Sequence, residues 1–206
     1  MRALAWEFPN DESLRETYNQ FMLGPSILVT PVLIPNVETV QGVFPGIGLG
    51  ERWYDWYTLT EVDAEPGENV TLQAPLEHIN VHVRGGAVLV LQEPKLTTAE
   101  TTKTPYSLLV ALDSNSAASG DLYLDDGESL QPNATRLVQV SCPTQKQINV
   151  TKSSHSSRTV TTAFRSRLMA RSKVLLYLVI SPLLDSTSSR SRLRSRLEGR
   201  TATLLS

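Results

Sequence analysis

Residues 76–94, LEHINVHVRGGAVLVLQEP, constrain the fold more than any other part of the chain. Apolar and polar side chains alternate over residues 79–84, which is the two-residue period of a strand with one apolar face. The Gly85-Gly86 pair permits the positive φ values of a tight turn. An apolar run over residues 87–91 follows, so the stretch predicts a β-hairpin in which the two runs pair.

Other segments repeat this pattern at spacings typical of β-sandwiches, and no long helices alternate with them, so a complete (β/α)8 barrel is excluded. Pro31 places the first run at a sheet edge or a bulge. The fold class is therefore mainly β, an antiparallel sandwich with a partial second β unit. The further predicted strands cover residues 26–34, 52–58, 70–72, 106–112, 120–124 and 136–140.

One helix is predicted near the start of the chain, capped by Asn10 or Asp11. Four apolar side chains fall at i, i+4, i+7 and i+8, which gives one stripe, and Gly24-Pro25 ends it. The stripe consists of Leu14, Tyr18, Phe21 and Met22.

The polar, Thr-rich residues 97–104 form the best candidate for a domain boundary.

Charge divides the chain into two contrasting parts. Residues 1–140 carry 7 basic and 19 acidic side chains, and residues 141–206 carry 12 basic and 2 acidic. A basic, Ser-rich tail can bind polyanions, but its arginines form no helical face and Phe164 and Tyr177 are its only aromatic residues, so we expect no nucleic-acid partner. Low-complexity disorder and translation in a wrong reading frame are the alternatives. We expect this tail to be irregular, although residues 161–173 could be drawn as a thin helix.

The sequence gives little indication of the cellular compartment in which the chain is found. Cys142 is the single cysteine, so no intrachain disulfide is possible. We expect no secretory signal peptide, because the first dozen residues are acidic and lack an apolar core. The apolar run at 174–184 is too short to span a membrane, so no membrane partner is expected. The sequons at Asn69 and Asn133 predict N-glycosylation in a secreted chain, and Asn149 is a third match.

No constellation of side chains predicts a catalytic, substrate-binding or metal site, and no cofactor is expected. Residues 125–128, DDGE, follow a strand and fit a turn with solvated carboxylates better than a Ca²⁺ loop. His78 and His82 are four apart, about 13 Å along a strand, which is too far to share one ion. His82 is expected on the polar face.

The aromatic run over residues 53–57, WYDWY, has two interpretations. Aromatic faces can stack on sugar rings, but alternate positions of a strand point inward, and buried aromatic residues dominate small β cores. A core role for at least two of the four aromatic side chains is therefore favoured. The four are Trp53, Tyr54, Trp56 and Tyr57.

Several motifs, in order, resemble the C-terminal part of glycoside hydrolase family 31, the α-glucosidase group. RALAWEFP at residues 2–9 resembles the loop after the last barrel helix, and QFMLGPSILVTPV at 20–32 resembles the entry into the proximal sandwich. Trp53-Tyr54-Asp55 and His82-Val83-Arg84-Gly85-Gly86 resemble strands inside that sandwich. Residues 106–113 and 122–129 resemble the start of the distal sandwich.

The resemblance implies four regions. These are residues 1–23, the end of the (β/α)8 barrel with one short helix; 24–95, the proximal sandwich; 96–140, a truncated distal sandwich; and 141–206, the basic tail. The family's catalytic carboxylates lie on barrel strands, and no residue here matches their motifs. The resemblance therefore implies an incomplete, secreted-type α-glucosidase, inactive alone, which would pack against a catalytic barrel. The alternative is an independent carbohydrate-binding or interaction module.

Overall fold

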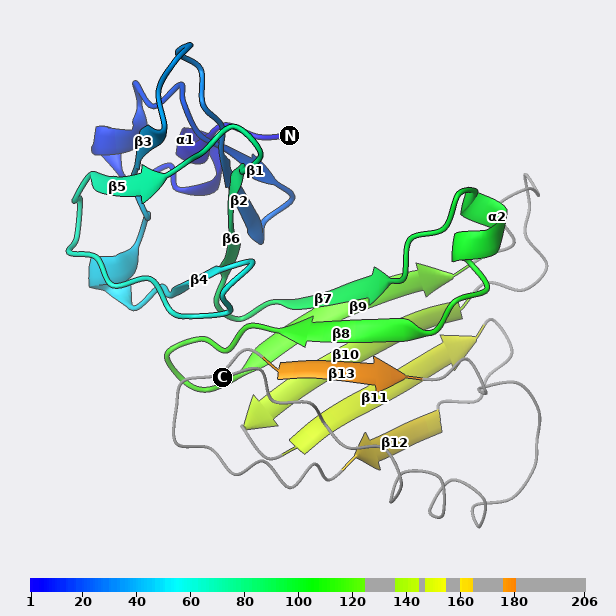
Figure 1. Cartoon of the computed structure of the whole chain (residues 1–206). Helices are drawn as coiled ribbons and strands as arrows, with labels where there is room; N and C mark the ends of the chain where they lie inside the picture. Colours follow the sequence, from blue (N-terminus) through cyan, green and yellow to red (C-terminus); the bar gives the residue numbers. More distant parts are fainter. Residues whose placement is uncertain (125–135, 145–146, 155–159, 165–175, 181–206) are drawn as a thin grey trace. The chain divides into compact units, whose positions relative to one another are not determined.

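The computed structural model describes residues 1–124, 136–144, 147–154, 160–164 and 176–180 (Figure 1). The chain divides into two compact units, Met1–Val88 with Val110–Leu175 and Leu89–Leu109 with Leu176–Ser206. Strands dominate the described residues, so the prediction of a mainly β, antiparallel fold is confirmed. The short helices are α1 (Leu4–Glu7), η1 (Glu12–Leu14), η2 (Ile47–Leu49) and α2 (Thr98–Thr101).

The first sheet combines three of the predicted strand segments with a segment that was predicted to be helical. Its order is β1-β2-β6-β4, with antiparallel pairing throughout. Pro31 follows the end of β2, where its missing N–H costs no ladder bond. The strands are β1 (Phe21–Leu23), β2 (Ile27–Thr30), β4 (Trp53–Asp55) and β6 (Asn80–Arg84).

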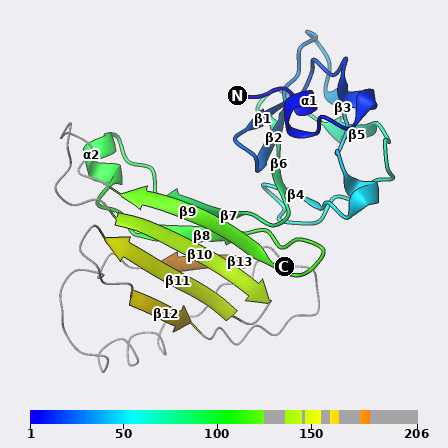
Figure 2. The same cartoon turned by 180° about the vertical axis from the view of Figure 1, so that it is seen from behind.

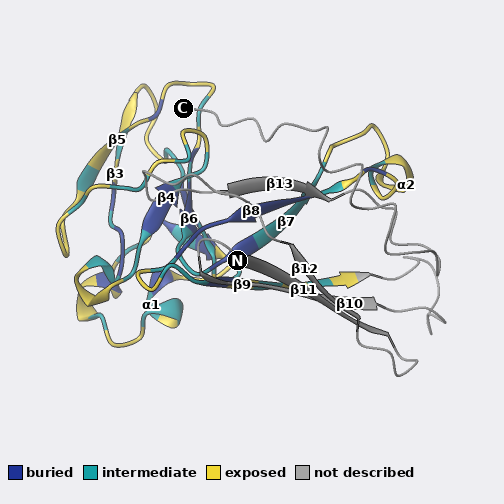
Figure 3. Ribbon diagram, turned by 90° about the horizontal axis from the view of Figure 1, so that it is seen from below, coloured by how far each residue is buried: buried dark blue, intermediate teal, exposed yellow. Residues whose placement is uncertain are grey.

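A core lies beneath this sheet and brings together distant parts of the first 88 residues. Trp53 is fully buried, and its indole Nε1 donates to the Pro45 carbonyl over 2.9 Å. The rings of Phe8 and Phe44 each lie 6.3 Å from the Trp53 ring, in the tilted geometry that aromatic pairs favour. Figure 3 shows the resulting burial of β4 and β6. The core cluster consists of Leu4, Leu14, Met22, Leu28, Phe44 and Trp53.

The predicted helix over the Asp11 to Met22 region is wrong. Asp11 does cap a helical turn, accepting from the Ser13 N–H over 3.1 Å, but the turn is the single 3-10 turn η1. Phe21 and Met22 belong to β1, where Met22 exchanges backbone hydrogen bonds of 2.8 Å with Arg2. Burial of Met22 between these partners outweighs the local helical stripe.

The predicted hairpin around Gly85-Gly86 is also wrong, because the two runs belong to different sheets. β6 lies between β2 and β4, whereas β7 (Val88–Gln92) pairs with β8 (Tyr106–Val110), in the order β13-β8-β7 with β13 (Leu176–Ile180). The Gly85 N–H donates to the Arg52 carbonyl over 2.7 Å, and Gly86, at φ 88°, donates to Ala111. The glycine pair is a crossover between sheets.

The side chains of β6 and of the residue before it also differ from the prediction in which of them are buried. His82, expected on a solvated face, is 2% exposed, whereas Ile79, expected on the apolar face, is 46% exposed. The His82 side of β6 faces the core, where its ring lies 4.7 Å from the Phe44 ring, and Ile79 precedes the strand instead of belonging to it.

A third sheet has the antiparallel order β12-β11-β10-β9, seen from behind in Figure 2. The predicted strand at 136–140 extends to Thr144 within β10. Strands β11 and β12 fall inside residues 141–206, where irregular structure was expected, and β12 replaces the drawn helix at its start. The strands are β9 (Ala118–Leu124), β10 (Arg136–Thr144), β11 (Gln147–Ser154) and β12 (Val160–Phe164).

Two smaller features complete the description. β3 (Thr39–Gly42) and β5 (Val70–Gln73) form an antiparallel two-stranded ribbon, which we call the β3–β5 ribbon. Helix α2 occupies the proposed boundary at residues 97–104, and the Thr97 side chain caps it by accepting from the Glu100 N–H over 3.3 Å.

Candidate functional site

Arg84, the last residue of β6, lies at the centre of an ion-pair cluster. Its guanidinium grips the Glu51 carboxylate with two hydrogen bonds, Nε to Oε2 over 2.8 Å and Nη2 to Oε1. Its Nη1 also donates to Glu7 Oε1 over 3.3 Å, and the second Glu7 oxygen accepts from Arg2 over 3.0 Å. All three central side chains are more than two thirds buried. Such forked Arg–carboxylate pairs are among the strongest hydrogen bonds in proteins.

The cluster joins three sequence segments. The Arg84 guanidinium carbon lies 4.7 Å from the centroid of the Phe8 ring, so a cation–π contact accompanies the ion pairs. Hydrogen bonding to Glu51 raises the pKa of Arg84, against the opposing effect of burial. The chemistry available to these carboxylates is that of ion-pair acceptors, which fasten residues 2–8 and Glu51 to β6.

Replacing Arg84 with alanine is expected to lower the free energy of unfolding by about 2 to 3 kcal/mol, because it leaves the largely buried Glu51 carboxylate without its donor and removes one of the two donors to Glu7. Urea denaturation followed by circular dichroism measures this change. Arg15→Ala is the matched control, since the Arg15–Glu12 pair is exposed on both sides and such pairs contribute little. Equal effects of the two substitutions would show that the cluster has no special role.

His82 is the second notable polar group, buried in the middle of the first sheet. Its Nε2 lies 3.9 Å from Asp55 Oδ2, and its ring meets the Phe44 ring edge-on at 4.7 Å. Burial lowers the pKa of His82 to about 4, although the neighbouring Asp55 charge opposes this shift. Within the described residues, His82 Nδ1 is buried without a hydrogen-bond partner. His82 is therefore a neutral core residue near pH 7, shielded from solvent.

Asp55 organises the turn that follows β4. Its Oδ1 accepts from the backbone N–H groups of Tyr57 and Thr58, over 2.9 and 2.6 Å, and from the Thr58 hydroxyl over 2.9 Å. An aspartate that closes a turn through its own downstream backbone is a standard Asx arrangement. Oδ1 of this carboxylate is thus engaged in local structure, while Oδ2 lies 3.9 Å from His82 Nε2.

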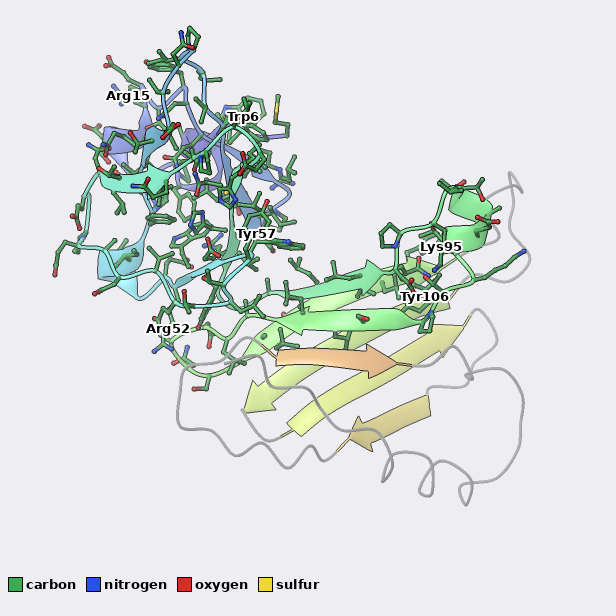
Figure 4. The ribbon with its side chains drawn as sticks, in the orientation of Figure 1. Trp6, Arg15, Arg52, Tyr57, Lys95 and Tyr106 are labelled. Atoms are coloured by element: carbon green, nitrogen blue, oxygen red, sulfur yellow. The ribbon has the colours of Figure 1, made fainter. Side chains whose placement is uncertain are left out.

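The aromatic run divides as the core interpretation predicts. Trp53 and Tyr54 are fully buried, and the Tyr54 hydroxyl donates to the Leu112 carbonyl over 2.7 Å. Tyr57 is 51% exposed, lies 4.7 Å from the His78 ring, and donates its hydroxyl to the Ile79 carbonyl (Figure 4). Tyr57 is thus a half-exposed aromatic side chain of the run, and its hydroxyl is already engaged.

The other candidate positions can be placed only in part. Asn69 is exposed, whereas Asn133 and the acidic run 125–128 lie outside the described residues. His78 contacts Tyr57 while His82 faces Asp55, and no group of three or more metal-binding side chains occurs in the described part of the chain. No helix among those residues is long and apolar enough to cross a membrane.

Sequence reasoning missed the roles of Glu7 and Glu51. They are 77 and 33 residues from Arg84, and nothing local distinguishes them from other acidic residues. The available signal was Arg84 itself, a charged side chain that ends an apolar strand, since a cation half-buried there requires an anion nearby.

Antiparallel sheets connected through the Gly85-Gly86 crossover define a β-sandwich fold. Residues 1–89 match the family described as glycosyl hydrolase family 31 C-terminal domain. The chain therefore belongs to glycoside hydrolase family 31 and corresponds to the C-terminal part of its α-glucosidase group, as the motifs predict.

Curated relatives and solved structures agree with this assignment. The chain is 64% identical to an Aspergillus niger α-glucosidase over 135 residues, covering 66% of this chain and 14% of that protein. It is 60% identical to a Schizosaccharomyces pombe α-glucosidase over 135 residues, again covering 66% and 14%. The Tris-bound glucosidase II alpha subunit superposes with a TM-score of 0.64 at 28% identity, covering 76% of this chain and 17% of that one. The chain thus spans about a seventh of the curated relatives' length.

Proposed function

We propose that this chain is a scaffold region of an α-glucosidase-type hydrolase, which cleaves O-glycosyl bonds in maltose- or starch-type α-glucosides. The observation that carries this proposal is the 64% identity to an α-glucosidase, sustained over 135 residues. The catalytic carboxylates of the intact enzyme lie outside this sequence. This chain contributes position and stability rather than a reacting group.

The proposed organisation keeps four regions. Residues 1–23 lead out of a catalytic barrel, 24–95 form the proximal sandwich, 96–140 belong to a distal sandwich, and 141–206 form the basic tail. The family domain matches residues 1–89, which span the first region and most of the second without marking a boundary between them. The enzyme is proposed to be secreted.

The catalytic barrel is the proposed partner of an exposed apolar face at the start of the chain. Met1, Trp6 and Leu23 are 87%, 76% and 45% exposed, and the antiparallel Arg2–Met22 bridge places Met1 opposite Leu23. Trp6 lies on α1, whose Leu4 is buried in the core. Exposed apolar side chains that lie close together, as Met1 and Leu23 do, are typical of surfaces that a partner covers.

The direct test is an assay of the purified chain alone. With maltose and with a chromogenic α-glucoside, the chain is expected to release no glucose or chromophore above a blank, while a full-length relative turns over both. Turnover by the chain alone would overturn the proposed division of roles. Titration with malto-oligosaccharides is expected to give no saturable signal, and saturable binding would favour an independent binding module instead.

A further inference from the structure

The structure places the Asn69 sequon, which the sequence indicates as a glycosylation motif, at the surface of the first unit. Asn69 is exposed and lies directly ahead of β5. The four preceding residues, 65–68, are also exposed and form a turn closed by the Glu68 N–H, which donates to the Glu65 carbonyl over 3.1 Å. Gly67 takes φ 75° in this turn. The acceptor asparagine is therefore presented at the end of a tight, solvent-facing turn.

The strand that follows orients the rest of the sequon. Val70 and Leu72 pack against the core cluster, whereas Thr71 and Gln73 are exposed. Because side chains alternate along a strand, the hydroxyl residue that defines the sequon points outward, away from the core. The motif thus has its acceptor and its hydroxyl accessible, with the apolar middle residue buried.

The neighbouring outer surface suits a carbohydrate. In the β3–β5 ribbon, Gln41 lies opposite Thr71 and Thr39 lies opposite Gln73, and all four are exposed and uncharged. The Gln41 amide donates to the Thr71 hydroxyl over 2.8 Å. Amide and hydroxyl groups can both donate to and accept from sugar hydroxyls. A glycan rooted at Asn69 can therefore lie over this face without displacing a charged or apolar group.

The other described sequon lacks this presentation. The backbone of Asn149 lies within β11, where it is paired with Ser141 of β10 on one side and Ala163 of β12 on the other. Cross-strand neighbours in a sheet have Cβ atoms only about 5 Å apart. The backbone of Asn149 thus lies inside a strand paired on both sides, whereas Asn69 precedes its strand.

We propose that Asn69 is an N-glycosylation site whose glycan covers the outer face of the β3–β5 ribbon. The co-reactant is an oligosaccharide linked to a polyprenyl pyrophosphate. The Asn69 Nδ2 forms a bond to the anomeric carbon of the sugar, the bond from that carbon to the pyrophosphate oxygen breaks, and the amide proton is lost as the polyprenyl pyrophosphate leaves. No oxidant or reductant is consumed. The modification rests on the proposed secretory route and not on the hydrolytic activity of the parent enzyme.

The test is translation of the full chain behind a cleavable signal sequence in the presence of microsomes. Only material protected from added protease is analysed, so every molecule scored has entered the lumen. We expect Asn69→Gln and Thr71→Ala each to remove one glycan-sized step in electrophoretic mobility, and Thr71→Ser to retain it. Asn149→Gln is the control and is expected to leave the Asn69 step in place.

Peptide mapping of the unaltered chain provides a second readout that does not depend on any variant folding. Treatment with a peptide N-glycosidase in heavy-oxygen water converts a glycosylated asparagine into labelled aspartate. We expect the label at position 69. Unlabelled Asn69 in protease-protected material, or an Asn69→Gln chain that migrates like the unaltered one, would overturn the proposal.

Discussion

Replacing Gly120 with alanine is expected to lower the free energy of unfolding by about 4 kcal/mol, at the upper end of single-substitution effects. Gly120 lies in β9 opposite Val140 of β10. A Cβ at this position would stand 2.2 Å from the Val88 carbonyl oxygen and 3.1 Å from its carbonyl carbon. Backbone atoms cannot rotate away as a flexible side chain can, so the backbones of Val88 and Gly120 would have to separate. Urea denaturation followed by tryptophan fluorescence measures the loss.

The matched control is Ser119→Ala, one residue earlier on the same strand. Ser119 is exposed, and its link to Gly86 uses the backbone N–H, which alanine keeps. We expect the control to unfold at nearly the same urea concentration as the unaltered chain. A Gly120→Ala chain as stable as this control would show that the close approach of Val88 and Gly120 is incorrect.

Acid is expected to destabilise the folded chain through His82. The pKa of His82 is lowered to about 4 in the folded chain, mainly by burial, from an ordinary value of 6.5. Between these two pH values the unfolded chain binds the proton more strongly, so the free energy of unfolding decreases as the pH falls from 6.5 to 4. At about 1.4 kcal/mol for each pH unit, the contribution of His82 reaches about 3 kcal/mol.

Two variants separate this effect from general acid unfolding. His82→Phe removes the titrating group while keeping a ring against Phe44, so its free energy of unfolding should fall less steeply over that interval. His78→Gln, which alters the other nearby histidine, should keep the steep slope. Asp55 opposes the shift and is left unchanged in both variants. Identical slopes for His82→Phe and the unaltered chain would contradict the account of His82.

Local alternation was sufficient to find most strands of the first 124 residues. β5 and β6 coincide with predicted strands to within a residue at either end, and β8 begins where expected at Tyr106. Pleated, half-buried segments carry their signal in neighbouring side chains, so no distant information is needed. The family resemblance is also confirmed, and each motif that carries it is likewise a short stretch of neighbouring residues.

Local alternation could not predict which strands pair with each other or which face of a strand is buried. The Gly85-Gly86 pair permits a hairpin or a crossover equally well, and the choice depends on Arg52 and Ala111, which receive its N–H bonds. His82 is buried against Phe44 of the core cluster, a residue 38 positions away in the sequence. The Arg84 cluster likewise depends on two acids far away in sequence. In each case the deciding partner lies tens of residues from the motif.

The scaffold role can be tested most directly in a chimera. Residues 1–140 would replace the matching segment of the Aspergillus niger α-glucosidase, and maltose hydrolysis would be measured beside the unaltered enzyme and a form lacking the segment. The account predicts that the chimera folds and hydrolyses maltose at a rate close to that of the unaltered enzyme, while the deleted form does not. A chimera that folds but fails to hydrolyse maltose, or a deleted form that retains full activity, would contradict it.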